Sequence, residues 1–191
     1  MYRCRTAAGL LALVLAAPLA ACGAATDSPA GAGASPTATS TSTSVAATTP
    51  PTAAAVPEQL KFTAQTVDGG RFAGESLAGK AAVLWFWAPW CPKCRAEAPR
   101  VAASARAAAG RVTFVGVAAQ DELPAMKEFV ADHALGGFVH LADVDASIWT
   151  RFGVTYQPAY AFIKPDGTVD VVKEQLSEPA LAERVGTLSK A

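Results

Sequence analysis

AAVLWFWAPWCPKC, at residues 81–94, carries the strongest structural signal in this 191-residue chain. Its first half, Ala81 to Trp87, is a continuous apolar run of strand length, which is typical of a strand buried on both faces of a sheet. An Ala/Arg/Glu-rich segment with helical character follows, so both cysteines fall at the start of a predicted helix. There the unpaired N–H groups and the positive end of the helix dipole favour the thiolate of Cys91, and Cys94 is close enough to form a disulfide with it. The placement therefore predicts dithiol redox chemistry.

The segments around this run predict one mixed sheet covered by helices on both faces. Expected strand segments are Leu60–Val67 and Arg71–Phe72 around a Gly-Gly turn, Ala81–Trp87, Arg111–Ala118, and Ala159–Ile163 and Thr168–Val172 around a Pro-Asp-Gly turn. Expected helices are Pro92–Ala109 with a kink at Pro99, Leu123–Asp132, Val144–Phe152, and Glu178–Leu188 beginning at Ser177. Strand, helix and strand in that order from Ala81 to Ala118 predict a right-handed crossover between parallel strands.

The N-terminus has the pattern of an export signal, predicted to span residues 1–21. Arg3 and Arg5 precede an apolar run from Ala7 to Ala21, which is shorter than the roughly 20 residues that a membrane-spanning helix needs. The run ends in LAAC at residues 19–22, which resembles a bacterial lipobox, so we expect cleavage before Cys22 and lipid attachment to it. The alternative is a plain signal peptide with small residues at its cleavage site.

Residues 22–57 are rich in Ala, Thr, Ser and Pro and contain almost nothing to bury. Such a composition predicts a disordered tether, with a root-mean-square span of roughly 30 Å. The globular domain is expected at residues 58–191. Lipid at Cys22 and this tether would hold the domain at the outer face of the bacterial cell membrane, within reach of exported proteins.

Composition excludes several classes of function. Sixteen basic and sixteen acidic side chains leave no net charge, so nucleic acid is an improbable partner. Of the four cysteines, Cys4 leaves with the signal and Cys22 carries lipid, which leaves Cys91 and Cys94 as the redox pair. We expect no metal site, because only His133 and His140 are available besides the pair and neither has ligand spacing. An inert disulfide is a weaker interpretation, because so short a loop stabilises little.

The chain resembles the thioredoxin superfamily from Leu60 to Ala191. The resemblance is carried by FWAPWCPKC at residues 86–94, by Pro99 eight residues after the first cysteine, and by Pro158 just before the C-terminal hairpin. Within the superfamily, the opening hairpin, the segment Leu123–Asp132 and CRAEAP at residues 94–99 are similar to the membrane-tethered TlpA/ResA/DsbE group. The long tether and the tryptophan-rich run resemble the actinobacterial DsbF/DsbE-like lipoproteins.

This resemblance implies a thioredoxin-like α/β fold, in which a central mixed β-sheet has helices on both faces and an N-terminal β-hairpin. It implies that Cys91 is an exposed nucleophile, that Cys94 is the buried resolving thiol, and that Pro158 is a cis-proline facing them. A substrate groove is expected at Trp90, Pro92, Lys93 and Gln157. Trp90 is the expected contact with unfolded substrate, and Lys93 favours the Cys91 thiolate.

One departure from the superfamily concerns the proton of Cys94. Thioredoxins proper place a buried acid on the strand before the motif, where this chain has Trp85. Glu97, one helical turn after Cys94, matches the acid of the membrane-tethered group and is a candidate to exchange that proton through a water. The other interpretation is a solvated glutamate on the surface of the helix, because the spacing ensures proximity but not burial.

We therefore expect an extracytoplasmic, monomeric thiol–disulfide oxidoreductase that oxidises or isomerises disulfides in exported proteins. It would need no cofactor beyond the Cys91–Cys94 disulfide, but it would need a membrane redox partner to reset that pair. One alternative is a reductant for cytochrome c maturation, because the exchange is reversible. A more remote alternative is a non-redox binding or chaperone lipoprotein.

Overall fold

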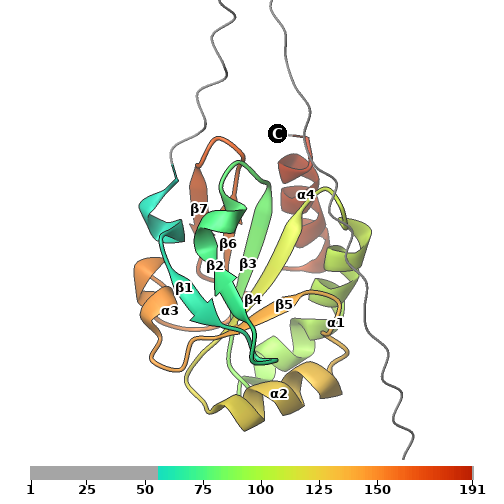
Figure 1. Ribbon diagram of the computed structural model, residues 1–191. Coiled ribbons are helices and arrows are strands. Elements are labelled where there is room, and N and C mark those ends of the chain that lie inside the picture. Colours follow the sequence, from blue (N-terminus) through green and yellow to red (C-terminus); the bar gives the residue numbers. More distant parts are fainter. Residues whose placement is uncertain (1–55, 191) are drawn as a thin grey trace, which may run out of the picture. The chain divides into compact units, whose positions relative to one another are not determined.

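The structure is a computed structural model that describes residues 56–190 (Figure 1). The expected signal peptide, Cys22 and all but the last two residues of the expected tether lie outside the described residues. Within residues 56–190, no helix has the length and the apolar character needed to cross a membrane.

A five-stranded mixed sheet lies at the centre, as predicted. Its strands follow the spatial order β5 (Val139–Ala142), β4 (Thr113–Ala118), β3 (Ala82–Trp87), β6 (Ala159–Ile163) and β7 (Val169–Val172). β3 pairs in parallel with β4 and antiparallel with β6, which confirms the predicted crossover. β6 and β7 form the predicted antiparallel hairpin.

β3 is the central strand because every one of its residues is apolar and buried. Its side chains alternate between the two faces of the sheet, as a strand requires. Val83, Trp85 and Trp87 enter one hydrophobic cluster, whereas Leu84 and Phe86 enter the other. Each face of the sheet therefore has its own core.

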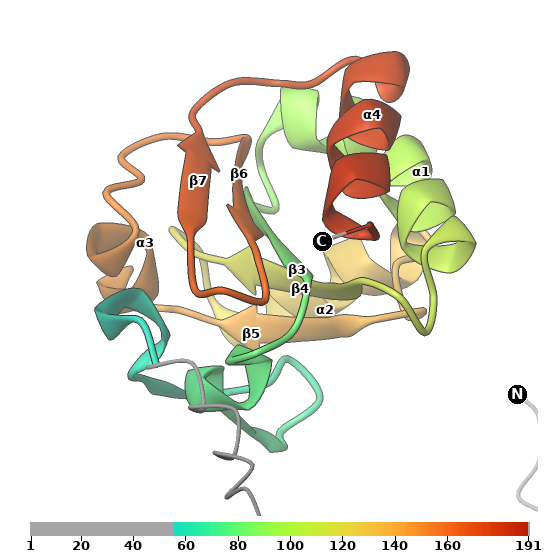
Figure 2. The same cartoon turned by 90° about the horizontal axis from the view of Figure 1, so that it is seen from above.

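Helices cover both faces. The first face packs against α1 (Pro92–Ala107), α2 (Leu123–Asp132) and α4 (Glu178–Leu188); we call it the dithiol face, because Cys91 and Cys94 belong to its core. The second, or opposite face, packs against α3 (Ser147–Arg151) and residues of the N-terminal segment. Figure 2 shows α1 and α4 on one side of the sheet and α3 on the other.

The N-terminal segment contains the predicted hairpin, which forms a separate two-stranded sheet. β1 (Thr63–Gln65) pairs antiparallel with β2 (Arg71–Ala73). Two 3₁₀ turns, η1 (Glu58–Leu60) and η2 (Gly74–Leu77), flank the hairpin and place Leu60 and Leu77 in the core of the opposite face. Gly74 approaches the chain so closely that a Cβ there would lie 2.4 Å from the Leu60 carbonyl oxygen.

Several sequence expectations were wrong in detail. The strand expected over Leu60–Val67 is only Thr63–Gln65, because Leu60 belongs to the 3₁₀ turn η1. β5 was not predicted, because this short strand follows a Gly-Gly pair and a histidine interrupts its apolar run. The helix expected from Val144 begins only at Ser147. Asp143 causes the later start, because its carboxylate accepts from the backbone N–H groups of Ile148 and Trp149 and so anchors the first turn.

Candidate redox site

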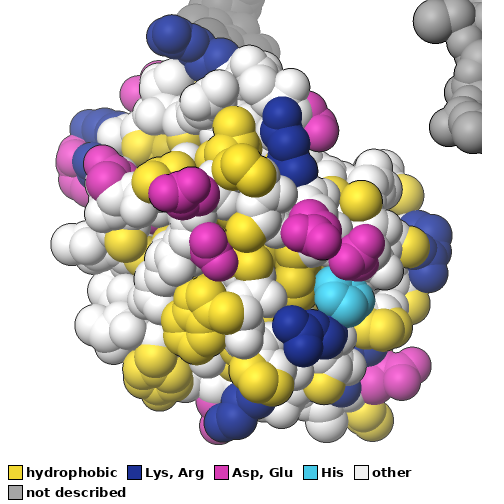
Figure 3. Space-filling view, turned by 90° about the horizontal axis from the view of Figure 1, so that it is seen from below, with side chains coloured by type: hydrophobic (Ala, Val, Ile, Leu, Met, Phe, Trp, Pro, Cys, Tyr) yellow, Lys and Arg dark blue, Asp and Glu magenta, His cyan; other side chains and the backbone are white. Residues whose placement is uncertain are grey.

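The two cysteines lie at the N-terminal end of α1, just after β3 ends. Figure 3 looks onto this end of the molecule and shows hydrophobic side chains gathered in the middle of the surface with charged side chains around them. Cys91 is the N-cap residue of α1, and Pro92 occupies the first turn, where a missing N–H costs nothing. Strand, cap and helix therefore place both sulfurs at one helix N-terminus, as the sequence predicted.

Both thiols are free in this structure and lie in the core. The Sγ of Cys91 accepts a hydrogen bond of 3.1 Å from the backbone N–H of Cys94. Cys94 is 0% exposed, which confirms the buried member of the pair. Cys91 is only 3% exposed, so the expectation of an openly exposed nucleophile was wrong. The reason is the cap itself, because the sulfur turns inward to accept the helix N–H.

Burial also controls the protonation of the second thiol. It raises the pKa of Cys94 far above the ordinary thiol value, with a smaller contribution in the same direction from the hydrogen bond to Cys91. The negative charge of Glu97 raises the pKa of Cys94 further. Cys94 therefore stays a thiol at neutral pH and requires a base before it can attack a disulfide.

Glu97, one helical turn after Cys94, is 0% exposed and lies close enough for its charge to act on the Cys94 thiol. This burial overturns the interpretation of Glu97 as a solvated helix-surface residue. The Nε1 of Trp85 donates a 2.6 Å hydrogen bond to Oε1 of Glu97, and a guanidinium nitrogen of Arg100 lies 3.5 Å from Oε2. Trp85 therefore occupies the position of the thioredoxin acid and binds an acid supplied by α1.

The protonation of Glu97 results from opposing influences. Burial raises the pKa of its carboxyl group, whereas the Trp85 N–H, the Tyr160 hydroxyl and Arg100 lower that pKa. Burial prevails, so the pKa lies above the ordinary value. A buried carboxyl group with a raised pKa holds its proton more readily than a solvated one, which suits it to exchanging a proton with a thiol.

The bond between Gln157 and Pro158 is cis, which confirms the expectation from the resemblance. Pro158 directly precedes Ala159, which pairs with Phe86 in the sheet. Because the pairing is antiparallel, Pro158 lies level with Trp87 at the end of β3 that leads to Cys91. Whether Pro158 and Gln157 contact a substrate remains a prediction.

The other expected groove residues lie at the surface. Trp90 is 52% exposed, and Pro92 and Lys93 are also exposed. The indole N–H of Trp90 donates 3.1 Å to the carbonyl oxygen of Gln120, a residue at φ +62° in the loop after β4. Trp90 is therefore held against a loop while much of its ring faces solvent.

The loop residues that border this site were not predicted from the sequence. Gln175 donates 3.1 Å to the carbonyl oxygen of Lys93, and the Tyr156 hydroxyl donates 2.6 Å to the carbonyl oxygen of Lys173. The loop after β7 is thus tied to α1 and to the segment before Pro158. No sequence signal marks these contacts, because each joins residues that are far apart in the chain.

Neither histidine was expected to be catalytic. His140 is buried on β5 beside Trp87, and its Nε2 lies 3.0 Å from the carbonyl oxygen of Leu135. Burial lowers the pKa of His140 to about 4, so the ring is neutral at physiological pH. Across residues 56–190, no three His, Cys, Asp or Glu side chains gather in a group that could hold a metal ion.

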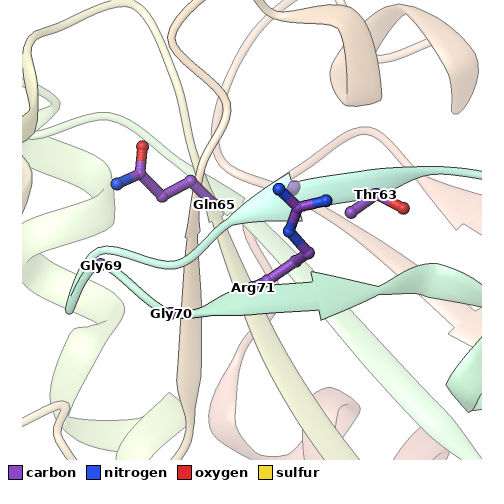
Figure 4. A pocket seen from close by; sticks show the side chains of 6 residues that line it. Thr63, Gln65, Gly69, Gly70 and Arg71 are labelled. Atoms are coloured by element: carbon purple, nitrogen blue, oxygen red, sulfur yellow. The ribbon is translucent and has the colours of Figure 1, made fainter.

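A cavity of about 460 Å³ lies elsewhere, on the N-terminal hairpin. Figure 4 shows Thr63 and Gln65 on one strand of the hairpin and Arg71 on the other. The cavity is lined by hairpin residues alone and contains no cysteine. It is therefore separate from the redox site.

Comparisons with known proteins agree with this geometry. Residues 55–172 match the AhpC/TSA family. The soluble secreted antigen MPT53 of Mycobacterium tuberculosis is 46% identical over 142 residues, which cover 73% of this chain and 81% of MPT53. The thiol-disulfide oxidoreductase ResA of Oceanobacillus iheyensis is 28% identical over 62% of each chain.

Solved structures give the same result. M. tuberculosis DsbF, solved in mixed oxidised and reduced forms, has 56% sequence identity and a TM-score of 0.69, covering 70% of this chain and 99% of that chain. A secreted M. tuberculosis disulfide oxidoreductase, described as homologous to Escherichia coli DsbE, has 46% identity and a TM-score of 0.66, covering 69% of this chain and 98% of that chain.

Proposed function

The chain belongs to the AhpC/TSA family of thioredoxin-like proteins and is a thiol–disulfide oxidoreductase, and on that premise we propose that it oxidises or isomerises disulfides in exported proteins. The observation that carries the proposal is the placement of the pair. Cys91 caps a helix through its sulfur, while Cys94 is sealed in the core. The hydrogen bond that the helix donates to the Cys91 sulfur stabilises the reduced form of the pair, and this makes the disulfide more oxidising.

In the oxidising direction, the pair begins as a Cys91–Cys94 disulfide. A substrate thiolate attacks the sulfur of Cys91, the bond to Cys94 breaks, and Cys94 leaves as a thiolate that takes up a proton. A second substrate thiolate then attacks the substrate sulfur of the mixed disulfide and releases Cys91 as a thiolate. The substrate loses two electrons and the pair gains them, which yields the reduced form seen here.

We assign to Glu97 the role of donating a proton to Cys94 and accepting it back. Its burial beside Cys94, and the absence of any carboxylate at position 85, support this role. When Cys94 leaves as a thiolate, protonated Glu97 supplies the proton; in the reverse direction, ionised Glu97 accepts it. One carboxyl group therefore serves both oxidation and isomerisation.

The substrate surface is proposed to run along Trp90, Pro92, Lys93, Gln157 and the cis-proline Pro158. Trp90, Pro92 and Lys93 are exposed, whereas Gln157 is half-buried and Pro158 is buried. An exposed, partly aromatic surface fits an unfolded protein chain better than a small molecule. We further propose that the protein acts outside the cytoplasm, since relatives are named as secreted proteins, and that lipid at Cys22 anchors it there. A membrane redox partner would reoxidise the pair.

The reduction potential of the pair tests the direction of electron flow. An oxidase is expected to have a potential well above that of thioredoxin, about −270 mV, and closer to that of DsbA, about −120 mV. The oxidised chain should then introduce disulfides into a reduced, unfolded protein, whereas the double variant Cys91→Ser/Cys94→Ser should not. A potential near −270 mV together with no oxidation would refute the oxidase proposal and favour a reductant.

A further inference from the structure

Trp85 and Tyr160 form a cross-strand pair directly beneath Glu97. In the register of β3 and β6, Trp85 is the partner of Tyr160, so both side chains project from the same face of the sheet. Both side chains are completely buried in the core of the dithiol face, which also contains Cys94. The two strands therefore present two polar tips, an indole N–H and a phenol O–H, to the helix that carries Glu97.

The two oxygens of Glu97 are not equally satisfied. Oε1 accepts the 2.6 Å hydrogen bond from Trp85, whereas Oε2 has only the guanidinium of Arg100 at 3.5 Å and no hydrogen bond of full geometry. The Tyr160 hydroxyl is also buried without a hydrogen-bond partner. A buried donor and a buried acceptor left open in one small region are costly unless they meet during function.

We propose that Trp85 and Tyr160 are a donor pair that holds the two oxygens of Glu97 in place while Glu97 exchanges the Cys94 proton. Trp85 fixes Oε1 permanently. Tyr160 turns its hydroxyl to Oε2 when the carboxyl group is ionised. Both are positioning residues, and their role rests on the proposed function, because it concerns the same exchange reaction.

The pair acts in the step that resolves a mixed disulfide. Ionised Glu97 removes the proton from the Cys94 thiol, and the Cys94 thiolate attacks the Cys91 sulfur. The Cys91–Cys94 bond forms, the bond from Cys91 to the substrate sulfur breaks, and the substrate leaves as a thiolate. The proton remains on Glu97, the cysteine pair is oxidised to a disulfide, and the substrate sulfur leaves with the two electrons of the broken bond.

Mutual effects on protonation support this geometry. The Tyr160 hydroxyl lowers the pKa of Glu97, while the negative charge of Glu97 and of Cys94 raises the pKa of Tyr160. Glu97, Cys94 and Tyr160 act on one another. Two further titratable groups, Cys91 and Arg100, also act on them. Loss of either donor should therefore raise the pKa of Glu97, so that more alkaline pH is needed to ionise it.

The test follows the reduced full-length chain, with Cys4→Ser and Cys22→Ser so that only Cys91 and Cys94 are thiols, as it reacts with oxidised glutathione at a series of pH values. Acid quenching and mass spectrometry separate the Cys91–glutathione mixed disulfide from the resolved Cys91–Cys94 disulfide. The variants are Tyr160→Phe and Trp85→Phe, each of which removes one donor. Trp149→Phe is the matched control, because its indole also makes a buried hydrogen bond, 3.1 Å to Val117 O, but on the opposite face.

Tyr160→Phe and Trp85→Phe should each slow resolution about tenfold on the acidic side of the profile and move its midpoint to higher pH, as expected when one hydrogen bond to a charged group is lost. Trp149→Phe should keep the midpoint of the unmodified chain. An unchanged midpoint in Tyr160→Phe and Trp85→Phe would overturn the inference while leaving the oxidoreductase intact. If the unmodified chain formed neither a mixed disulfide nor the Cys91–Cys94 disulfide, the proposed function itself would fail.

A double-mutant cycle distinguishes an effect of Tyr160 through Glu97 from a simple loss of packing. Glu97→Gln keeps an acceptor for Trp85 but cannot ionise, so its profile should lose the midpoint. Adding Tyr160→Phe to Glu97→Gln should then change the rate less than twofold. A full tenfold loss in the double variant would show that Tyr160 acts independently of Glu97 and would refute the donor pair.

Discussion

The two faces of the sheet treat buried polar groups differently. On the opposite face, the buried carboxylate of Asp143 accepts from Ser147 Oγ and from the backbone N–H groups of Ile148 and Trp149, and the indole of Trp149 donates to Val117 O. On the dithiol face, five buried polar atoms have no hydrogen-bond partner. They belong to Trp87, Glu97, Arg100, His140 and Tyr160.

The contrast separates structural from chemical use of the same residue types. Each face has a buried acid and a tryptophan with a bonded N–H, so burial alone does not mark function. Both carboxylate oxygens of Asp143 accept hydrogen bonds, and these bonds hold the first turn of α3 in place. Glu97 keeps one oxygen free of full hydrogen bonds beside a thiol that needs a base. Incomplete satisfaction, rather than burial alone, therefore separates Glu97, the carboxylate to which we assign the proton, from Asp143.

The largest effect should come from the dithiol itself. Cys91→Ser should reduce thiol–disulfide exchange to the uncatalysed background, because the oxygen cannot form the mixed disulfide. The melting temperature should stay close to that of the reduced chain, since serine also caps a helix well. The turnover of a dithiol substrate and a thermal melt measure the two quantities. Substantial remaining turnover would place the nucleophile elsewhere.

Separate substitutions of the two buried acids, Asp143 and Glu97, test the comparison between the two faces. Asp143→Ala should lower the free energy of unfolding by about 3 kcal/mol, because it leaves buried N–H groups unsatisfied, and should not change the exchange rate of the folded protein. Glu97→Gln should slow resolution about a hundredfold, as the loss of a general base does, with little loss of stability.

Urea unfolding and stopped-flow exchange on the same samples distinguish the two variants. The comparison breaks down if Asp143→Ala slows exchange in the folded state, or if Glu97→Gln unfolds the protein while its exchange rate is normal.

We expect buried His140 on the dithiol face to make the free energy of unfolding depend on pH. Its folded-state pKa of about 4 lies below the unfolded value of 6.5, so the unfolded chain binds more protons between these values. The contribution of neutral His140 is complete above pH 6.5 and is lost as pH falls toward 4, by up to about 3 kcal/mol.

The free energy of unfolding, measured by urea titration at several pH values, should therefore fall less steeply on acidification in His140→Phe than in the unmodified chain. His133→Gln is the matched control, because His133 is only half-buried at the end of α2. Parallel slopes for His140→Phe and the unmodified chain would show that the buried ring does not titrate in this range.

A smaller effect is expected at Gly116 on β4. A Cβ there would lie 2.1 Å from Nδ1 of His140 and 2.9 Å from Nε1 of Trp87. Gly116→Ala should therefore destabilise the fold by about 2 kcal/mol, as overpacking does. Gly136→Ala is the control, since nothing lies near its added Cβ. Equal denaturation midpoints for the two variants would mean that this part of the dithiol face has spare room.

Much of this arrangement was predictable from the sequence, because local patterns carry it. The apolar run before Cys91 predicted the central strand, and Pro92 with the alanine-rich segment predicted α1. The contacts that complete the site were not predictable from local patterns. Trp85 meets Glu97 twelve residues away, and Tyr160 joins them only through strand register. Spacing alone left Glu97 either solvated or buried, and only the packing of β3 against α1 decides between them.

The contacts of the residues that border the site were also not predictable from local sequence patterns. Gln120 and Gln175 contact Trp90 and Lys93 through loops whose course depends on the whole fold. The inward turn of the Cys91 sulfur is likewise a cap interaction that residue type did not reveal. Sequence patterns therefore predicted where the two cysteines lie, whereas packing determines how their protons and sulfurs are held.

Trapping with Cys94→Ser tests the central claim most directly. With Cys4→Ser and Cys22→Ser in every variant and without the resolving thiol, the reduced full-length chain should accumulate a mixed disulfide with a disulfide-bonded substrate protein, and peptide mapping by mass spectrometry should place it on Cys91. The converse variant, Cys91→Ser, should trap nothing, because Cys94 is sealed in the core. Trapping through Cys94, or no mixed disulfide in Cys94→Ser, would contradict the assignment of Cys91 as the nucleophile and of the dithiol face as the reactive one.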